Sequence, residues 1–442
     1  MKNQEITVVG AGLAGSECAF QLAQLGYKVK LIEQKSIKKS PAHTLNTFAE
    51  LVCSNSFRSD SLGSAVGIMH QELRELDSII IKTADKNKVP AGDALAVDRN
   101  TFSTEITEIL NNHPNITIIH EEFKNLKEYA KDNIVVIATG PLSSEGINQE
   151  ILEIIGEKSF NFFDAIAPIV YKDSIDFSQA WWQSRYEKGN AKDYINCSMT
   201  ESEYEIFYNE LINAEYMEFE DWEKDIPYFE GCLPIEVMAK RGKQTLLFGP
   251  FKPVGLVNPH TSEQPFAVLQ LRQDNSQGSL YNMVGCQTKL KYNEQTRIFK
   301  LIPALKNVEF AKLGSIHKNT FINSPLVLNN DLSLKNNKNI FFAGQITGCE
   351  GYVESTSVGL MCALFVNARI KEKNIEIPKM SSMGAILNHI LESKDNYQPS
   401  NINFGLFPEI KLENVKKIKK ADKKELIMQQ SLSNIKIFKG SI

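Results

Sequence analysis

A glycine-rich turn near the N-terminus constrains the fold of this chain more than any other feature of its sequence. Residues 6–9 are apolar and predict a buried strand, and residues 10–15 read Gly-Ala-Gly-Leu-Ala-Gly, the spacing G-x-G-x-x-G. In such a unit the first glycine permits a tight turn and the second lets a pyrophosphate approach the backbone. The third lets the following helix, expected over 13–25, lie close to the sheet with its positive end toward the phosphates.

The residues after this turn support a dinucleotide-binding unit. Gly26 ends the helix, residues 27–32 predict a second strand, and Glu33 ends that strand about 20 residues beyond the turn, where an acid that binds a ribose 2′-hydroxyl is expected. The alternative is a glycine turn that binds no ligand, and the placement of Glu33 argues against it. The predicted contacts in this unit are Gly10, Ala11, Gly12, Leu13, Ala14, Gly15 and Glu33.

Length and composition limit the classes of protein to which this chain can belong. The chain has 442 residues, 42% of them hydrophobic, which allows two or three domains, and no run approaches the roughly 18 apolar residues of a membrane span. The first predicted strand begins too early to leave room for a signal peptide, so a cytoplasmic protein is expected. The seven cysteines show no C-x-x-C spacing, which predicts reduced thiols, no zinc site and no other metal site.

A second strand–glycine–helix unit lies late in the chain. Residues 339–345 read Asn-Ile-Phe-Phe-Ala-Gly-Gln, and a helix is expected over 355–370. The segment between the two units holds all three tryptophans and many turn signals. The predicted fold class is therefore α/β, a split Rossmann-like domain (1–163 and 326–442) with an inserted α/β substrate domain (164–325). The Lys-rich end of the chain predicts a solvated helix.

Several local elements are predicted within this framework. They are helices over 65–76 and 102–110, strands over 116–119 and 134–138, and helix-capping chemistry at Ser54-Asn55-Ser56. Thr139-Gly140 follows the last of these strands and is either a dinucleotide contact or a structural turn.

Motifs spread in order along the chain resemble one family, the folate- and FAD-dependent RNA uracil-5-methyltransferases, which are related to the GidA-type tRNA-modifying flavoproteins. The motifs lie at 48–56, 89–92, 94–99, 162–170, 229–242, 271–275, 342–348, 350–355 and 403–408. The resemblance implies that FAD is the dinucleotide, that 5,10-methylenetetrahydrofolate donates one carbon and that NAD(P)H supplies electrons. It implies 5-methyluridine as the product, with reduced FAD as carrier and reductant.

Two cysteines match positions that this family uses for catalysis, Cys53 and Cys232. Uracil C5 becomes nucleophilic when a thiolate adds to C6, and such a thiolate needs a polar or cationic setting. The resemblance implies that one cysteine activates uracil and that the other assists at C5 or at the flavin, and the two roles stay unassigned. The same resemblance implies that Gly344, Gln345, Gly348 and Gly351 lie along the flavin.

A net charge of −4 gives no global attraction to nucleic acid, so RNA contacts require a local basic patch. The candidates for phosphate contacts are Lys240, Arg241, Lys252, Arg272, Arg297, His317 and Lys318. A solvated surface charge is the alternative for each. His43 and Tyr352 could contact folate or flavin but are not placed in the catalytic set.

The sequence departs from the family pattern where RNA contacts are expected. His43-Thr44 stands where two histidines are usual, and Lys318 replaces a usual arginine, which loses bidentate phosphate geometry. The leading hypothesis is methylation of a uridine in the tRNA T-loop, and the same chemistry on a 23S ribosomal RNA uridine is an alternative. A flavin oxidoreductase acting on a small molecule and a non-catalytic, flavin-bound RNA chaperone are the alternatives from other classes. The oligomeric state stays open between monomer and dimer.

Overall fold

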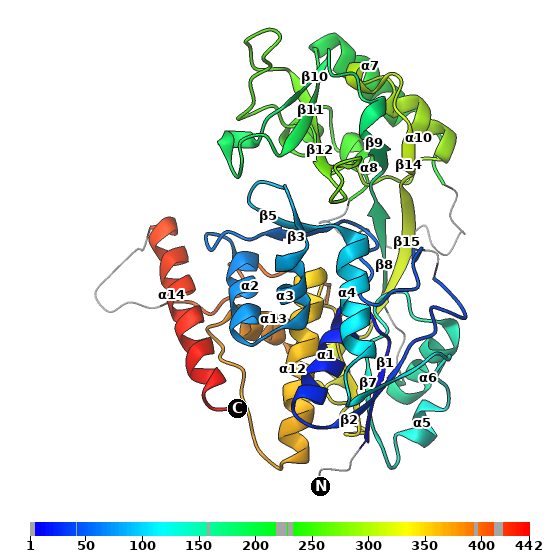
Figure 1. The fold of residues 1–442 in the computed structure, drawn as a ribbon, viewed down its shortest axis with the longest axis vertical. Helices are drawn as coiled ribbons and strands as arrows, with labels where there is room; N and C mark the ends of the chain where they lie inside the picture. Colours follow the sequence, from blue (N-terminus) through cyan, green and yellow to red (C-terminus); the bar gives the residue numbers. More distant parts are fainter. Residues whose placement is uncertain are drawn as a thin grey trace.

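The computed structural model describes residues 5–40, 42–156, 160–217, 228, 233–392, 397–410 and 419–442, with only the backbone for 160–164, 317, 318 and 420. Two lobes are stacked along its long axis (Figure 1). The lower lobe contains both ends of the chain, and the upper lobe, drawn in green, is formed by the middle of the chain.

Five parallel strands form the sheet of the lower lobe, in the order β16-β7-β1-β2-β6. They are β1 (Glu5–Val9), β2 (Lys28–Ile32), β6 (Ile116–Ile119), β7 (Ile134–Ile137) and β16 (Ile340–Phe342). The strand β7 reads Ile-Val-Val-Ile and is buried throughout, as expected for a parallel strand covered on both faces. Since β16 pairs in parallel with β7, a late segment completes the N-terminal sheet, which confirms the predicted split α/β fold.

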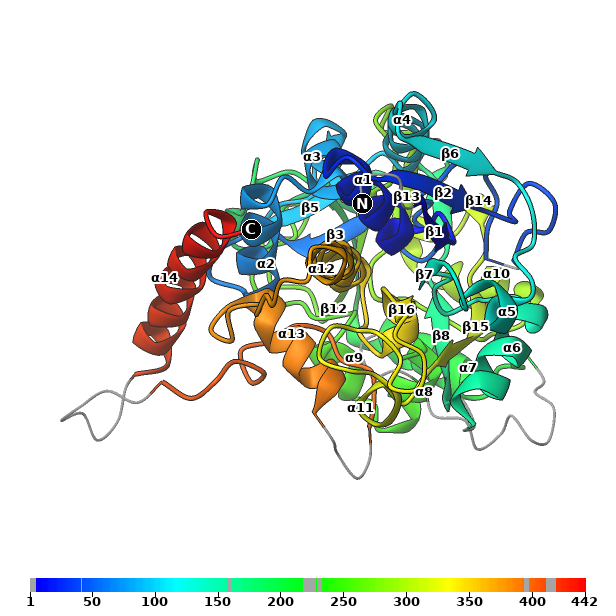
Figure 2. The same ribbon diagram turned by 90° about the horizontal axis from the view of Figure 1, so that it is seen from below.

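The helices that follow β1 and β16 lie side by side against this sheet. They are α1 (Leu13–Gln24) and α12 (Tyr352–Ile370), which are neighbours in Figure 2. A Cβ added to Gly359 would overlap the backbone of Ala14, so this glycine permits their close contact. Almost every residue of α12 is buried, as its apolar sequence requires.

The lower lobe contains further helices. They are α2 (Ala65–Glu75), α3 (Ile79–Lys86), α4 (Arg99–Asn111), α5 (Leu126–Tyr129), α6 (Glu145–Ile155), α11 (Ser324–Val327), α13 (Ser382–Leu391) and α14 (Lys420–Lys439). Local sequence explains two of their starts: Ser64 accepts the N–H of Gly67 at the start of α2, and Asp98 accepts those of Asn100 and Thr101 at the start of α4.

A small antiparallel sheet lies on top of the lower lobe. It has the order β3-β5-β4 and consists of β3 (Ser56–Ser59), β5 (Ala94–Val97) and β4 (Lys88–Val89). The helix-capping prediction at Ser54-Asn55-Ser56 was wrong, because a strand begins at Ser56. The Asn55 side-chain amide donates to the carbonyls of Val97 and Gln273. These two hydrogen bonds link the small sheet to the sheet of the upper lobe, and the amide caps no helix.

The upper lobe contains a six-stranded antiparallel sheet with its own core. The order is β10-β11-β12-β13-β9-β14, formed by β9 (Ile169–Tyr171), β10 (Ala180–Trp182), β11 (Tyr194–Met199), β12 (Ala267–Gln273), β13 (Leu280–Met283) and β14 (Phe310–Lys312). Its helices are α7 (Glu201–Ile212), α8 (Ile235–Lys240), α9 (Thr245–Phe248) and α10 (Tyr292–Phe299). A separate hydrophobic cluster includes Tyr204, Phe207, Phe251 and Phe299.

A two-stranded ribbon connects the lobes. It pairs β8 (Phe160–Ile166) with β15 (Ser315–Phe321) in antiparallel register (Figure 1). The domain boundaries that we predicted at 164 and 325 fall within β8 and within α11.

The C-terminal helix α14 is docked, which corrects the prediction of a solvated helix. Ile427, Ser431, Ile435 and Phe438 are buried at helical spacing, and the helix packs against α2. The lysines on its other face dominate the composition and hid this narrow apolar stripe. Within the described ranges, no helix combines the length and the apolar content of a membrane span.

Candidate active site

The glycine turn after β1 has the geometry that the motif predicts. Gly10 adopts φ +97°, and a Cβ there would lie 2.6 Å from the carbonyl oxygen of Ala138. A Cβ at Gly15 would overlap the carbonyl oxygen of Gly10, so the helix can approach the sheet only with glycine at this position. A Cβ at Gly12 would meet nothing within 4 Å, which leaves open space at the start of α1. A ligand phosphate fits this space.

Glu33 lies at the end of β2, beside the same turn. One of its carboxylate oxygens accepts the N–H of Ala11 at 2.7 Å, and the other accepts the N–H of Lys35 at 2.8 Å. The acid is therefore fixed next to the turn, in the position from which such residues bind a ribose hydroxyl.

One cavity joins this turn to the start of α12. It is lined by Val9, Gly10, Gly12, Leu13, Ala14, Glu33, Lys35, His43, Val52, the segment 138–144, Gln345, Tyr352 and Ser355, among others. A ligand with a pyrophosphate in its middle suits this lining, because it includes the glycine turn, Glu33 and the start of α12. Both Thr139 and Gly140 line the cavity, and the Thr139 hydroxyl bonds that of Ser143 at 2.6 Å.

The later glycines are placed beside the cavity and not in its lining. A Cβ at Gly344 would lie 2.5 Å from the Cβ of Ala14, and one at Gly351 would lie 2.5 Å from a carboxylate oxygen of Glu354. At Gly348 it would overlap the Tyr397 hydroxyl. Within this segment Gln345 lines the cavity, and its amide donates to Glu350 at 2.6 Å.

The backbone around Cys53 is held from three directions. The phenolic oxygen of Tyr352, in α12, accepts the N–H groups of Cys53 and Ser54. Arg99, in α4, donates to the carbonyl of Leu51 at 3.0 Å. Arg272, in β12, donates to the Ser54 hydroxyl at 2.7 Å and to the Asn55 amide oxygen at 3.2 Å. These bonds place Cys53 at the junction of the lobes, one residue after the cavity-lining Val52.

Cationic side chains surround this thiol. Electrostatic interactions link Cys53 to Arg99, Arg272 and Lys312. Burial, followed by the charge of Arg99, holds the pKa of the Lys312 ammonium below its ordinary value. Burial also lowers the pKa of Arg272. For Arg99 burial acts in the same direction, but the charge of Asp274, its hydrogen bond and smaller neighbouring contributions together raise the pKa. The neighbourhood of Cys53 is therefore cationic.

The other cysteines in the described part of the chain are buried. They are Cys18, Cys197, Cys286, Cys349 and Cys362, and Cys53 differs from them in being partly exposed. Burial raises the pKa of the thiols of Cys197, Cys286 and Cys349, which keeps them in the unreactive protonated form. Cys232 lies outside the described residues, so its predicted role stays a prediction.

The predicted RNA-binding residues do not form one group. Lys240 lies over the ring of Tyr216, and Arg297 pairs with Glu210 and Glu294. Arg241 directly follows α8, and Lys252 lies shortly after α9. The side chains of His317 and Lys318, in β15, are outside the described set. Arg272 is only 9% exposed and bonds the Cys53 loop, so the alternative of a solvated surface charge is wrong for this residue, and its phosphate contact stays a prediction.

Sequence reasoning missed the residues that hold Cys53. Tyr352 was left outside the catalytic set, Arg99 belonged to a family motif without an assigned role, and Lys312 had no signal. Only the proximity of β12, β14, α4 and α12 in the fold reveals them, because the four elements are far apart in sequence.

The sequence model of the family described as Glucose inhibited division protein A matches residues 5–374. A methylenetetrahydrofolate–tRNA-(uracil-5-)-methyltransferase TrmFO of Zymomonas mobilis is 50% identical over 446 residues, with 99% of both chains covered. The enzyme of the same name from Fusobacterium nucleatum is 52% identical over 440 residues, again with 99% of both chains covered.

A solved structure has a similar fold. GidA of Aquifex aeolicus in its form II crystal superposes with a TM-score of 0.66 at 16% sequence identity, covering 88% of this chain and 68% of that one. At this level of identity the likeness concerns the fold alone.

Proposed function

Because this chain belongs to the family of methylenetetrahydrofolate–tRNA-(uracil-5-)-methyltransferases, related to the GidA flavoproteins, we propose that it methylates C5 of a uridine in tRNA. Methylenetetrahydrofolate donates the carbon and NAD(P)H provides the electrons. We place this activity in the cytoplasm.

One observation carries the proposal: the only partly exposed cysteine among those described is held at the rim of the dinucleotide cavity. Tyr352 lines that cavity and also accepts the N–H of Cys53. A plain hydride-transfer enzyme does not need a thiol at this place, whereas uracil requires a nucleophile before its C5 can accept a carbon.

The residues of the cavity suit FAD. The open space at Gly12, at the N-terminus of α1, would hold the pyrophosphate, and Glu33 would hold a ribose hydroxyl. Gln345 and Tyr352 line the other end, where the flavin ring would lie. When bound, FAD carries the carbon from folate and supplies the hydride that completes the methyl group.

The two cysteines, with the cations beside Cys53, are proposed to activate the uracil. The Cys53 thiol either adds to C6, or assists at C5 or at the flavin, and Cys232 is proposed for the other task. Arg99, Arg272 and Lys312 supply the positive charge beside the Cys53 thiol. Since Leu51, Cys53, Ser54 and Asn55 are all held by bonds from other elements, the thiol is oriented before substrate arrives.

The proposal is tested with purified enzyme, methylenetetrahydrofolate, NADPH and RNA from a strain that lacks 5-methyluridine. Mass spectrometry of the digested RNA should detect 5-methyluridine in tRNA. Cys53→Ala and Cys232→Ala should each abolish the product while the protein keeps its yellow flavin. Methylation of 23S ribosomal RNA alone would move the target to that RNA, and absence of the product from every RNA would overturn the proposal.

A further inference from the structure

Among the described residues, only one of the three positive charges beside Cys53 is paired with a carboxylate. Arg99 pairs with Asp274 at 2.8 Å. Arg272 is 9% exposed, yet its described bonds go to neutral groups, the Ser54 hydroxyl and the Asn55 amide oxygen. A buried guanidinium without an anion is unfavourable, because the charge has lost water and gained no counter-charge.

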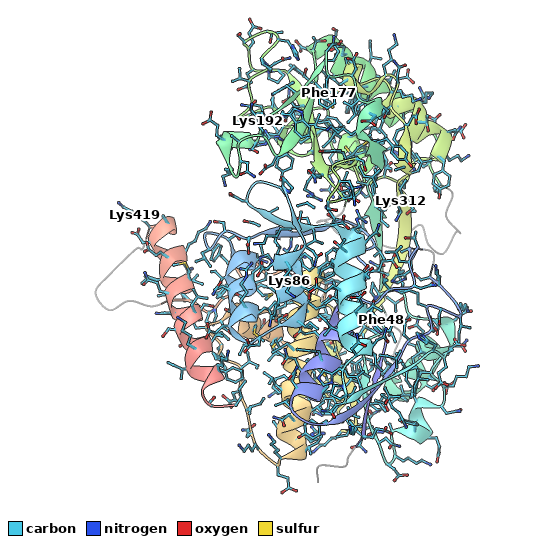
Figure 3. The ribbon with its side chains drawn as sticks, viewed as in Figure 1. Phe48, Lys86, Phe177, Lys192, Lys312 and Lys419 are labelled. Atoms are coloured by element: carbon cyan, nitrogen blue, oxygen red, sulfur yellow. The ribbon has the colours of Figure 1, made fainter. Side chains whose placement is uncertain are left out.

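Lys312 adds a third charge to this group. It is the last residue of β14, and Figure 3 shows it at the junction of the two lobes. Among the residues that the structure describes, it has no hydrogen-bond or ion-pair partner, although it is more than half-buried. The carboxylate of Glu50 attracts it from a distance but is engaged by Lys35 and by the N–H of Thr44.

The pairing of these cations leaves room for an anion. Arg99 has a carboxylate partner in Asp274, whereas the described bonds of Arg272 go to neutral groups and Lys312 has none in the described part of the chain. The Lys312 ammonium offers three N–H donors. The site therefore suits a ligand group with a negative charge and several acceptor oxygens, placed close to Cys53. A phosphodiester has this charge and these oxygens.

We infer that Lys312, with Arg99 and Arg272 behind it, binds the phosphate on the 5′ side of the target uridine. This inference rests on the proposed function. A Cys53 thiol that acts on the uracil, by adding to C6 or by removing the C5 proton, must face the C5–C6 edge of the base. In the anti conformation C6 lies on the same side of the nucleotide as its 5′ phosphate. A uridine that presents this edge to Cys53 brings that phosphate to the same cations.

The carboxylates of folate fit this place less well. They lie at the glutamate end of the molecule, which the aminobenzoyl group separates from the carbon that is transferred. If the transferred carbon lies near uracil C5, the glutamate end points away from the Cys53 thiol. The contact therefore belongs to RNA, and it fixes the nucleotide that reacts.

The first experiment compares Lys312→Gln with Lys306→Gln, an exposed lysine of the same lobe. Flavin absorbance and thermal unfolding check that both variants are folded and hold the cofactor. For Lys312→Gln, tRNA affinity should fall about 10-fold or more, and the slope of log affinity against log salt should decrease by about one. Lys306→Gln should bind tRNA as the wild type does, and the KM for methylenetetrahydrofolate should be unchanged in both.

The second experiment neutralises the phosphate. A tRNA assembled with one methylphosphonate linkage 5′ to the target uridine should lose the same factor of affinity for the wild-type enzyme. Lys312→Gln should bind the modified and unmodified tRNA equally, because the contact is already absent.

Two outcomes would overturn the inference. A raised KM for methylenetetrahydrofolate with unchanged tRNA affinity would assign the cations to a folate carboxylate. Unchanged values for both substrates would show that Lys312 binds no substrate anion. The proposed function fails separately, when the wild-type enzyme forms no 5-methyluridine, whatever the binding measurements give.

Discussion

The phenolic oxygen of Tyr352 accepts two hydrogen bonds from the backbone of the cysteine loop, from the N–H of Cys53 at 2.9 Å and from that of Ser54 at 3.1 Å. Tyr352 is the first residue of α12 and lines the dinucleotide cavity. Burial raises the pKa of its phenol, which keeps the hydroxyl protonated. One side chain therefore joins the cofactor cavity to the backbone of the cysteine loop.

Tyr352→Phe should lower the rate of methylation with little change in substrate binding. The variant leaves two backbone N–H groups without their acceptor, so the Cys53 loop loses its fixed position. We expect kcat to fall about 10-fold or more, measured as 5-methyluridine formation with saturating tRNA and folate. Tyr27→Phe is the control, since the Tyr27 hydroxyl bonds Asn367 and touches no residue of the cysteine loop. Equal rates for the two variants would contradict the positioning role.

Two alanine substitutions in the glycine turn should separate flavin binding from folding. Gly15→Ala should destabilise the protein by about 1–3 kcal/mol or more, because its Cβ would overlap the Gly10 carbonyl. Gly12→Ala should fold with a normal melting temperature when stripped of flavin, since its Cβ meets open space, but should bind FAD more weakly. Thermal unfolding of the apoprotein and the flavin absorbance of the holoenzyme measure the two effects. Full flavin occupancy in Gly12→Ala would contradict the assigned pyrophosphate position.

Asp274→Asn should be strongly destabilising. Asp274 and Arg99 are 5% and 12% exposed, so the substitution leaves a buried guanidinium without its counter-charge, at a cost of about 3–5 kcal/mol. Denaturant unfolding measures this cost. The control is Glu210→Gln, which breaks an exposed pair with Arg297 and should cost less than about 1 kcal/mol. Similar losses in both variants would argue against the interior pair as a support of the lobe junction.

Stability should fall as the pH rises from about 5 to 8, because of a buried acid under the C-terminal helix. Burial raises the pKa of Glu72 from 4.5 to about 7. Hydrogen bonds from Ser431 and from the N–H groups of Ser382 and Met383 act in the opposite direction and lower it, but burial is the larger effect. The folded state binds the proton more tightly than the unfolded state. The contribution of protonated Glu72 to the free energy of unfolding is therefore complete below pH 4.5. It is lost as the pH passes 7, a change of about 3 kcal/mol at most.

The measurement is the free energy of unfolding as a function of pH, for the wild type and for Glu72→Gln. The variant should lose this part of the pH dependence, because its side chain carries no charge at any pH. The exposed Glu108→Gln should retain it. A wild-type profile that is flat or rising between pH 5 and 8, with Glu72→Gln parallel to it, would exclude Glu72 as the source.

Local sequence patterns predicted an element well where the pattern alone determines the conformation. The glycine spacing at 10–15, the apolar run of β7 and the helix α2 were all predicted near their observed bounds. Predictions were wrong where tertiary partners replace local ones. Asn55 bonds two sheets in place of a helix end, and the apolar stripe of α14 finds its partner in α2.

The sequence by itself determined that a dinucleotide turn begins the chain, that a late strand and helix complete its sheet, and that Cys53 belongs to a family motif. These features depend on spacing within a few residues. Only the tertiary structure decided which groups surround the thiol. Tyr352, Arg99, Arg272 and Lys312 come from α12, α4, β12 and β14. No local pattern records the distance between such elements, because that distance is set by how the two lobes pack on the ribbon of β8 and β15.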